Sequence, residues 1–278
     1  MGVLPDVAGI DVGLSLLEPT SGVCRTGHSG DSVSHTYIDR LSRLAALGAQ
    51  HRFAVLAIDG PVLPRGTLHY SARPCEKVFV WGAFQRRCKC GESHIRGTGQ
   101  ALRRAGVDTA HAFEGTVCGG VAHQGYPRVF ASHNIVEAFP NAFLGVSLPD
   151  AVFTSALARG EKFDWLYDQW LLHNGPEQLR AVVAWERDIL WQAVRENQHH
   201  DERAALICAL TAICAIRVSY VAVGEAAGGY FFLPPWNVWA PWARLALDRN
   251  RTDWRLPAPV DVWIDGTRYG PSERLPTT

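Results

Sequence analysis

The segment FAVLAIDGPVLP, at residues 53–64, decides how this chain of 278 residues folds. Its apolar residues follow one another without polar alternation, which is typical of a strand that is buried on both faces of a sheet. Strands of this kind occur in α/β proteins, where helices cover both faces. The apolar run ends at Asp59, so we expect a carboxylate at the tip of this strand.

Two other predicted strands also end in a carboxylate. AGIDVGLS, at residues 8–15, places Asp11 after an apolar run, and SHNIVEAFP, at 132–140, places Glu137 before a proline. One such acid alone is explained by turn chemistry. Neighbouring strands, however, bring their ends together, and ligands of open α/β sheets bind at those ends. We therefore expect the three carboxylates to converge.

A fourth acid, Asp201, begins the stretch HHDERAALICALTAICAIRV at 199–218. The apolar part of this stretch, residues 204–216, is shorter than the roughly 20 residues that a bilayer requires. We expect a buried helix there, and no membrane partner.

Converging carboxylates repel one another unless a cation neutralises them, and hard oxygen ligands select magnesium or manganese. The predicted ligands of Mg²⁺ or Mn²⁺ are Asp11, Asp59, Glu137 and Asp201. Two such ions, roughly 4 Å apart, promote phosphodiester hydrolysis by water. His200, next to Asp201, is a candidate general base or outer-shell partner.

Residues 65–104 form a loop-rich segment in which basic residues outnumber acids. Exposed arginines near a carboxylate–metal site are suited to hold substrate phosphates, so we expect a nucleic acid or nucleotide partner. A solvated surface loop is the alternative. The candidate substrate-binding residues are Arg73, Arg86, Arg87 and Arg96.

Cysteines do not follow a common metal-binding spacing. Cys88, Cys90 and His94 are spaced more tightly than in zinc knuckles, so we expect free thiols there rather than zinc. The chain has seven cysteines, and its start lacks a basic region followed by an apolar one. These features predict a reduced, cytoplasmic protein.

The C-terminal half is mostly helical in pattern. Residues 150–198 are expected to form a helical insert whose tryptophans pack on the sheet. A tail rich in Trp and Pro, at 235–278, is expected to wrap over the surface. The predicted architecture is a single α/β domain over residues 1–278, with a mixed sheet flanked by helices.

Five motifs in order, AGIDVG, LAIDGP, IVEAFP, HDERAALICALTA and GGYFFLP, resemble those of the domain of unknown function 429 family. The resemblance runs from about residue 8 to 234. Members of this family are described as ribonuclease H-like predicted nucleases. The resemblance implies a ribonuclease H-like fold, metal-dependent phosphodiester hydrolysis, and metal-binding roles for Asp11, Asp59, Glu137 and Asp201.

The resemblance departs from the family pattern at Ala204, where a second helix acid is usual. Glu202 is close in sequence but points about 100° away on a helix. The alternative function is therefore a catalytically weakened module that binds nucleic acid or protein on the same fold. Actin-like kinases and ATPases also begin with G-I-D-x-G, but this chain has no second phosphate loop.

Overall fold

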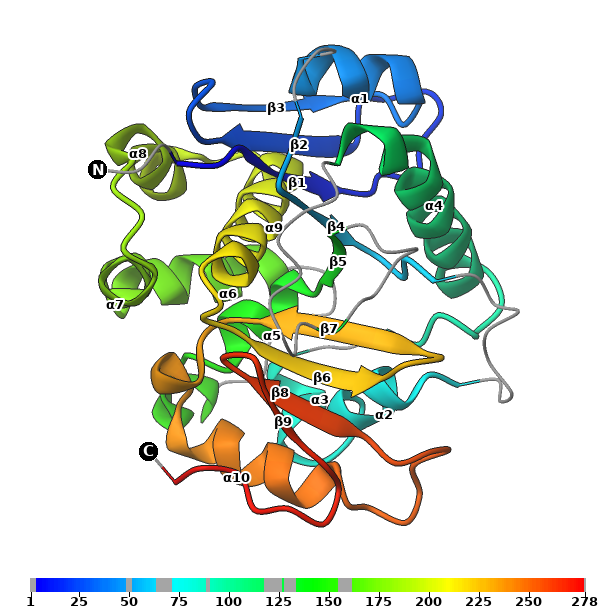
Figure 1. The fold of residues 1–278 in the computed structure, drawn as a ribbon, viewed down its shortest axis with the longest axis vertical. Coiled ribbons are helices and arrows are strands. Elements are labelled where there is room, and N and C mark those ends of the chain that lie inside the picture. Colours follow the sequence, from blue (N-terminus) through cyan, green and yellow to red (C-terminus); the bar gives the residue numbers. More distant parts are fainter. Residues whose placement is uncertain are drawn as a thin grey trace.

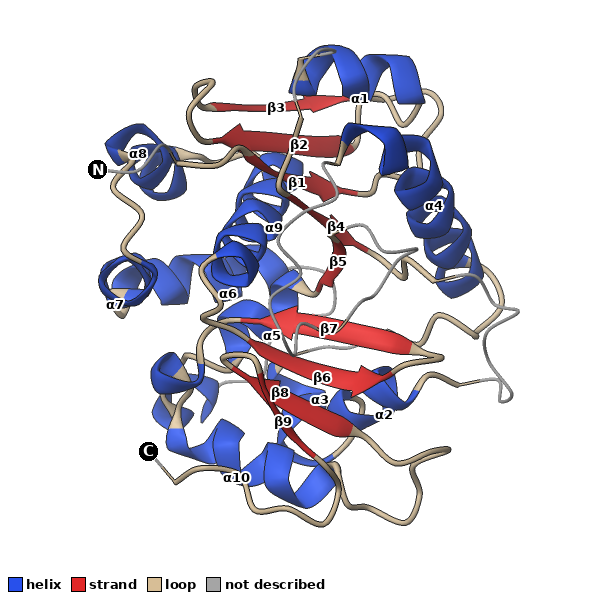
Figure 2. Cartoon of the chain, viewed as in Figure 1, coloured by secondary structure: helices blue, strands red, loops and turns tan. Residues whose placement is uncertain are grey.

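The computed structural model describes residues 4–48, 52–63, 72–88, 91–117, 127, 134–154 and 162–277. Its centre is a sheet of nine strands in the order β3-β2-β1-β4-β5-β7-β6-β8-β9 (Figure 2). The strands are β1 (Val7–Asp11), β2 (Ser21–Thr26), β3 (Ser32–Thr36), β4 (Val55–Asp59), β5 (Ile135–Ala138), β6 (Val221–Glu225), β7 (Gly229–Leu233), β8 (Asp261–Ile264) and β9 (Thr267–Tyr269). The helices are α1 (Arg40–Leu47), α2 (Pro74–Phe79), α3 (Gly82–Arg87), α4 (Thr98–Phe113), α5 (Pro140–Gly145), α6 (Lys162–Leu172), α7 (Gly175–Val183), α8 (Asp188–Glu196), α9 (His200–Ile216) and α10 (Pro241–Asn250).

The sheet is mixed. Strands β1, β4, β5 and β7 run parallel, whereas β2 and β3 at one end and β6, β8 and β9 at the other pair antiparallel. Strand β4 lies between two parallel neighbours, and its residues from Val55 to Ile58 are buried. The predicted α/β class, with a mixed sheet flanked by helices, is confirmed.

Helices cover both faces of the sheet (Figure 1). Helix α9 packs on β1, β2 and β4, and every residue from Arg203 to Ala215 is buried. The opposite face carries α1 and α4, which are joined where Arg43 Nη1 donates to Thr109 Oγ1 at 2.5 Å. No helix in the described part of the chain is long and apolar enough to cross a membrane.

Two glycines allow α9 to lie directly against the strands. A Cβ atom on Gly9 would come within 2.2 Å of the Ala209 backbone nitrogen. One on Gly22 would come within 1.9 Å of the Asp201 carbonyl oxygen. Neither backbone atom can yield without moving the helix, so both positions require glycine. This close contact fixes the first turn of α9 over β1 and β2.

The predicted helical insert is present in the described residues as α6, α7 and α8, which lie to one side of α9 (Figure 1). Trp170, Trp185 and Trp191 are almost fully buried, as expected for residues that pack the insert on the sheet.

Two other expectations were wrong. The tail does not only wrap the surface: Trp236 and Trp239 are buried, and β8 and β9 extend the sheet beyond β6. The segment 65–104 is less loop-rich than expected, because its described part contains α2, α3 and the start of α4. Apolar residues of α2, α3 and α10 pack with the tail tryptophans in a second core cluster.

Replacing Gly22 with Ala tests the close approach of α9. The added methyl group meets backbone rather than a flexible side chain, so we expect a loss of about 1–3 kcal/mol in the free energy of unfolding. Urea denaturation measures this. Gly115→Ala is the matched control, because its Cβ meets nothing within 4 Å. Equal stability of both variants would contradict the contact.

Candidate active site

One pocket collects most of the predicted catalytic and metal-binding residues. It has a volume of about 410 Å³, and Asp11, Asp59, Glu137 and His200 are all on its wall. Ala204, which stands where the resembling family usually has a second helix acid, lines the same pocket. Phe139, Phe163, Phe231, Ile95 and Leu102 form apolar parts of the wall. The volume is within the range of small-molecule sites.

The central pair of this pocket is Asp11 and Asp59. They end the parallel strands β1 and β4 at the same level, because Asp11 is the register partner of Asp59. Side chains at paired positions of a sheet project from the same face, so the two carboxylates are neighbours. Within the described residues, neither carboxylate has an ion-pair partner. Two acids are thus placed together, and among the described residues neither forms an ion pair with a basic side chain, although the charge of Arg43 acts on Asp11.

This arrangement disfavours the charged form of both groups. Burial, followed by the nearby charges of Asp59 and Asp201, raises the pKa of Asp11 well above its usual range, and Arg43 opposes this only partly. Burial and the charge of Glu137 raise the pKa of Asp59. A shared proton or a bound cation relieves such a pair.

Glu137, unlike Asp11 and Asp59, forms an ion pair with an arginine. Arg73 Nη1 donates to Glu137 Oε1 at 2.7 Å, and Arg73 Nη2 binds the other carboxylate oxygen. Both side chains are almost fully buried. Burial raises the pKa of Glu137, and Arg73 counteracts this effect. The bidentate pair engages both oxygens of Glu137 and counters its charge, so a metal ion bound there would compete with Arg73.

Arg73 also binds a second acid that lines the pocket, Glu76. Its Nη1 binds Glu76 Oε1 at 3.0 Å, and its Nε donates to the Gly228 carbonyl at 2.7 Å. Glu76 in turn accepts from the Ser93 backbone N–H at 3.0 Å. Arg73 therefore connects α2, β5 and the turn before β7. The basic segment around Arg73 predicts an exposed arginine that is available to phosphates. Arg73 is instead buried, and its guanidinium group forms ion pairs with Glu76 and Glu137.

The other predicted arginines lie outside the pocket wall. Arg86 and Arg96 are exposed, and Arg96 stands next to Ile95, which does line the pocket. Arg87 pairs with Asp150 and lies 4.4 Å from the ring centroid of Trp242. Arg96 is therefore the best placed of the three to meet an anionic ligand at the pocket.

Asp201 stands in the first turn of α9, beside the pocket rather than on its wall. Its charge contributes to the raised pKa of Asp11, which places the two carboxylates within electrostatic reach. Burial raises the pKa of Asp201 itself, and the neighbouring His200, His199 and His35 oppose this.

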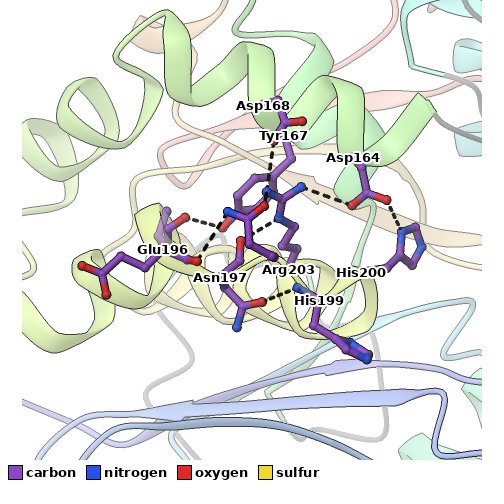
Figure 3. Close-up of polar contacts among 10 residues, drawn as sticks. Asp164, Tyr167, Asp168, Glu196, Asn197, His199, His200 and Arg203 are labelled. Carbon is purple, nitrogen blue, oxygen red and sulfur yellow. Dashed lines mark hydrogen bonds and ion pairs between the residues drawn. The ribbon is translucent and has the colours of Figure 1, made fainter.

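Arg203 fixes this turn of α9 to α6 (Figure 3). Its guanidinium group lies 3.0 Å from Asp168 and 3.5 Å from Asp164, and it packs 4.7 Å from the centroid of the Tyr167 ring. Its Nε donates to the Asn197 carbonyl at 2.8 Å. The start of α9 is thereby held against both the insert and the strand tips.

His200, in this turn, lines the pocket. Figure 3 shows that its imidazole ring contacts Asp164. The His200 Nδ1 atom lies 2.8 Å from Asp164 Oδ2. Asp164 therefore contacts only Nδ1, and the other ring nitrogen of His200, Nε2, does not contact Asp164. A histidine held by a carboxylate in this way is suited to take a proton from a reacting group.

The Cys88, Cys90 and His94 cluster is only partly described, because Cys90 lies outside the described residues. Cys88 is fully buried, and burial raises the pKa of its thiol to about 12, so it stays protonated. The five cysteines that the structure describes are free and buried.

Several functional candidates have no clear signal in the sequence. Glu76, Glu92 and Asp164 enter the site through the fold, and none of them is among the site residues predicted from the sequence. Among the described residues, three ligand atoms lie within 4.8 Å of one another in only one group, which is His35, His199 and Glu202. The four predicted carboxylates therefore do not form such a group.

Comparison of the chain with protein-family models, with curated proteins and with solved structures finds no match.

Replacing Arg73 with Ala tests the buried ion-pair network. The substitution leaves Glu137 and Glu76 buried without their cation, so we expect the free energy of unfolding to fall by about 3–5 kcal/mol. Chemical denaturation measures the loss. Arg96→Ala removes an exposed arginine and should change stability by no more than about 0.5 kcal/mol. A similarly small effect for Arg73→Ala would show that the network is not formed.

The raised pKa of Asp59 predicts a pH dependence of stability in metal-free protein. Since the folded state binds this proton more tightly than the unfolded state, stability falls as pH rises from the ordinary aspartate pKa through the raised one. Asp59→Asn removes this contribution.

The variant should therefore gain stability relative to wild type at neutral pH, and gain less at about pH 4. Thermal unfolding in the presence of a chelator measures the difference. Asp188→Asn, at an exposed position of α8, is the control. A gain that is independent of pH would contradict the shifted titration.

Proposed function

We propose that this protein is a metal-dependent phosphodiesterase that acts on nucleic acid or a nucleotide, with Mg²⁺ or Mn²⁺ as cofactor and water as nucleophile. The observation that carries the proposal is the pair Asp11 and Asp59. These carboxylates stand side by side at two parallel strand tips, in a pocket, without a neutralising cation among the described residues. Carboxylate oxygens in this arrangement are the donors that such ions prefer.

The charges of the pocket wall support the same proposal. The described residues that line it include five acids and no lysine or arginine. Three of the acids are already engaged: Glu76 and Glu137 by Arg73, and Glu92 by Lys77. An anionic phosphate therefore meets no lysine or arginine among the described residues of this wall, and a bound metal ion would supply the positive charge there.

The donor set fits one divalent ion better than two. Asp11 and Asp59 would hold it, and Asp201, whose charge acts on Asp11, is a further carboxylate beside the pocket. Glu137 is occupied by Arg73, and Ala204 offers no ligand where the resembling family has a second acid. When bound, the ion supplies Lewis-acid activation of a phosphodiester and of water.

The chain itself contributes the remaining functions. His200, oriented by Asp164, is placed to accept the proton of the attacking water. Phe139 and Phe163 give the pocket wall an apolar part. Arg96, exposed beside the pocket, is placed to attract a polyanion.

The fold assignment is part of this proposal. The strand order β3-β2-β1-β4-β5, with β2 antiparallel to β1 and with β1, β4 and β5 parallel, is compatible with a ribonuclease H-like sheet. It supports membership of the domain of unknown function 429 family, together with the five ordered sequence motifs.

A nuclease assay tests the proposed reaction. Labelled single- and double-stranded DNA and RNA are incubated with Mg²⁺ or Mn²⁺ and with wild type, Asp11→Asn or Asp59→Asn. We expect cleavage by wild type and at least about a 100-fold lower rate in both variants, since even outer-shell partners of a metal contribute about 10- to 100-fold. Asp188→Asn should cleave normally.

A module that only binds nucleic acid is the second candidate, and Ala204 on the pocket wall favours it. Binding of an oligonucleotide by wild type without cleavage under any of these conditions would support it and would contradict the proposed hydrolysis.

A further inference from the structure

A second group of ligand-type side chains lies at the edge of the sheet, outside the pocket. It consists of His35 from β3, His199 immediately before α9, and Glu202 in the first turn of α9. One ligand atom from each residue lies within 4.8 Å of the others. The residues are far apart in the sequence, and the contact between β3 and α9 brings them together.

The three side chains are already held near one another. His35 Nδ1 lies 2.8 Å from Glu202 Oε1. The imidazole rings of His35 and His199 stack with centroids 3.9 Å apart and planes within 5°. Both rings are partly exposed. A metal ion can therefore replace the hydrogen bond between His35 and Glu202 without opening the core. The parallel rings must turn so that their nitrogens face one ion, and exposed side chains do this readily.

One asparagine, Asn197, forms hydrogen bonds with two members of the group and so positions them. Asn197 Nδ2 donates to Glu202 Oε2 at 2.6 Å, and Asn197 Oδ1 accepts from the His199 backbone N–H at 2.8 Å. This leaves Glu202 Oε1 turned to His35. Outer-shell contacts of this kind orient the ligands of metal sites.

The backbone places this group in line with the aspartate pair. His35 is the register partner of Gly22, and continuing the register of β1 with β2 by one residue places Gly22 opposite Asp11. Asp59, Asp11, Gly22 and His35 thus form one row across four strands. Gly22 leaves the space that the backbone of Asp201 occupies. The first turn of α9 therefore covers the row from the carboxylate end to the histidine end.

The two ends of this row differ in chemistry. Oxygen donors alone select Mg²⁺ or Mn²⁺, whereas imidazole nitrogens with one carboxylate suit first-row transition metals such as Zn²⁺. Asp201 adds a further acid near this end, with its Oδ2 at 3.9 Å from His199 Nδ1.

We propose that His35, His199 and Glu202 bind one transition-metal dication of the Zn²⁺ type, at a site separate from the carboxylate pocket. The ion joins the strand β3 to the first turn of α9. It thereby stabilises the turn that carries Asp201 and His200, without taking part in the proposed hydrolysis.

Zinc titration of chelator-treated full-length protein tests the site, with isothermal titration calorimetry as the measurement. We expect one Zn²⁺ per wild-type chain and at least about a tenfold weaker affinity in His35→Ala, His199→Ala and Glu202→Gln. His173→Ala removes an exposed histidine elsewhere and should bind as wild type does. Asp11→Asn and Asp59→Asn should also bind Zn²⁺ normally, whatever the outcome of the nuclease assay.

Two further measurements keep the result independent of folding. Zn²⁺ should raise the melting temperature of wild type and of His173→Ala, but not of His35→Ala, because binding to the folded state alone stabilises it. Co²⁺ in place of Zn²⁺ should give a visible ligand-field absorption that is lost in the same variants. The proposal is overturned if His35→Ala and His199→Ala bind Zn²⁺ as tightly as wild type, or if zinc binding is lost in Asp59→Asn instead.

Discussion

The direct contact of α9 with β1 and β2 is the constraint on which the site depends. Gly9 and Gly22 provide no side chain where the helix backbone passes, so the helix lies closer to the sheet than larger residues permit. This places Asp201 near Asp11 and brings His199 and Glu202 to His35. Arg203 holds the same turn from the other side, through α6. This packing therefore positions the residues that α9 and the residue before it bring to the two proposed metal sites.

The distribution of buried charge distinguishes Glu137 from the aspartates at this end of the sheet. Arg73 neutralises Glu137 and Glu76, and these acids become part of the scaffold. No cation plays that role for Asp11 and Asp59 among the described residues, so their repulsion remains in the metal-free protein. Removing a partner from a buried ion pair is costly, whereas an acid pair without a cation is ready to bind one. The fold thus separates an ion-paired carboxylate, Glu137, from the pair Asp11 and Asp59 within one pocket.

Much of this fold can be predicted from the sequence, because buried strands and helices have strong local patterns. The apolar runs that end at Asp11, Asp59 and Glu137 do form three parallel strands, and the apolar stretch after Asp201 forms α9. The hairpin β8–β9 was not predicted, since its short strands resemble the turn-rich tail around them.

Side-chain partners are harder to predict than strands. The bond between Arg73 and Glu137 joins residues far apart in the chain, and the position of Arg73 in a basic segment indicates an exposed residue instead. His35 has no neighbour in the sequence that points to a metal, and its partners come from a helix more than half the chain away. Such sites depend on which elements pack together, a property that local patterns do not encode.

The central claim is that Asp11 and Asp59 together hold a divalent metal ion. Calorimetric titration of Mn²⁺ into chelator-treated protein tests it most directly, in a His35→Ala background that disables the histidine group. We expect one Mn²⁺ per chain, and we expect this binding to be lost when either Asp11→Asn or Asp59→Asn is added and retained when Asp188→Asn is added. Unchanged Mn²⁺ binding in the two site variants, or no binding by the parent protein, would contradict it.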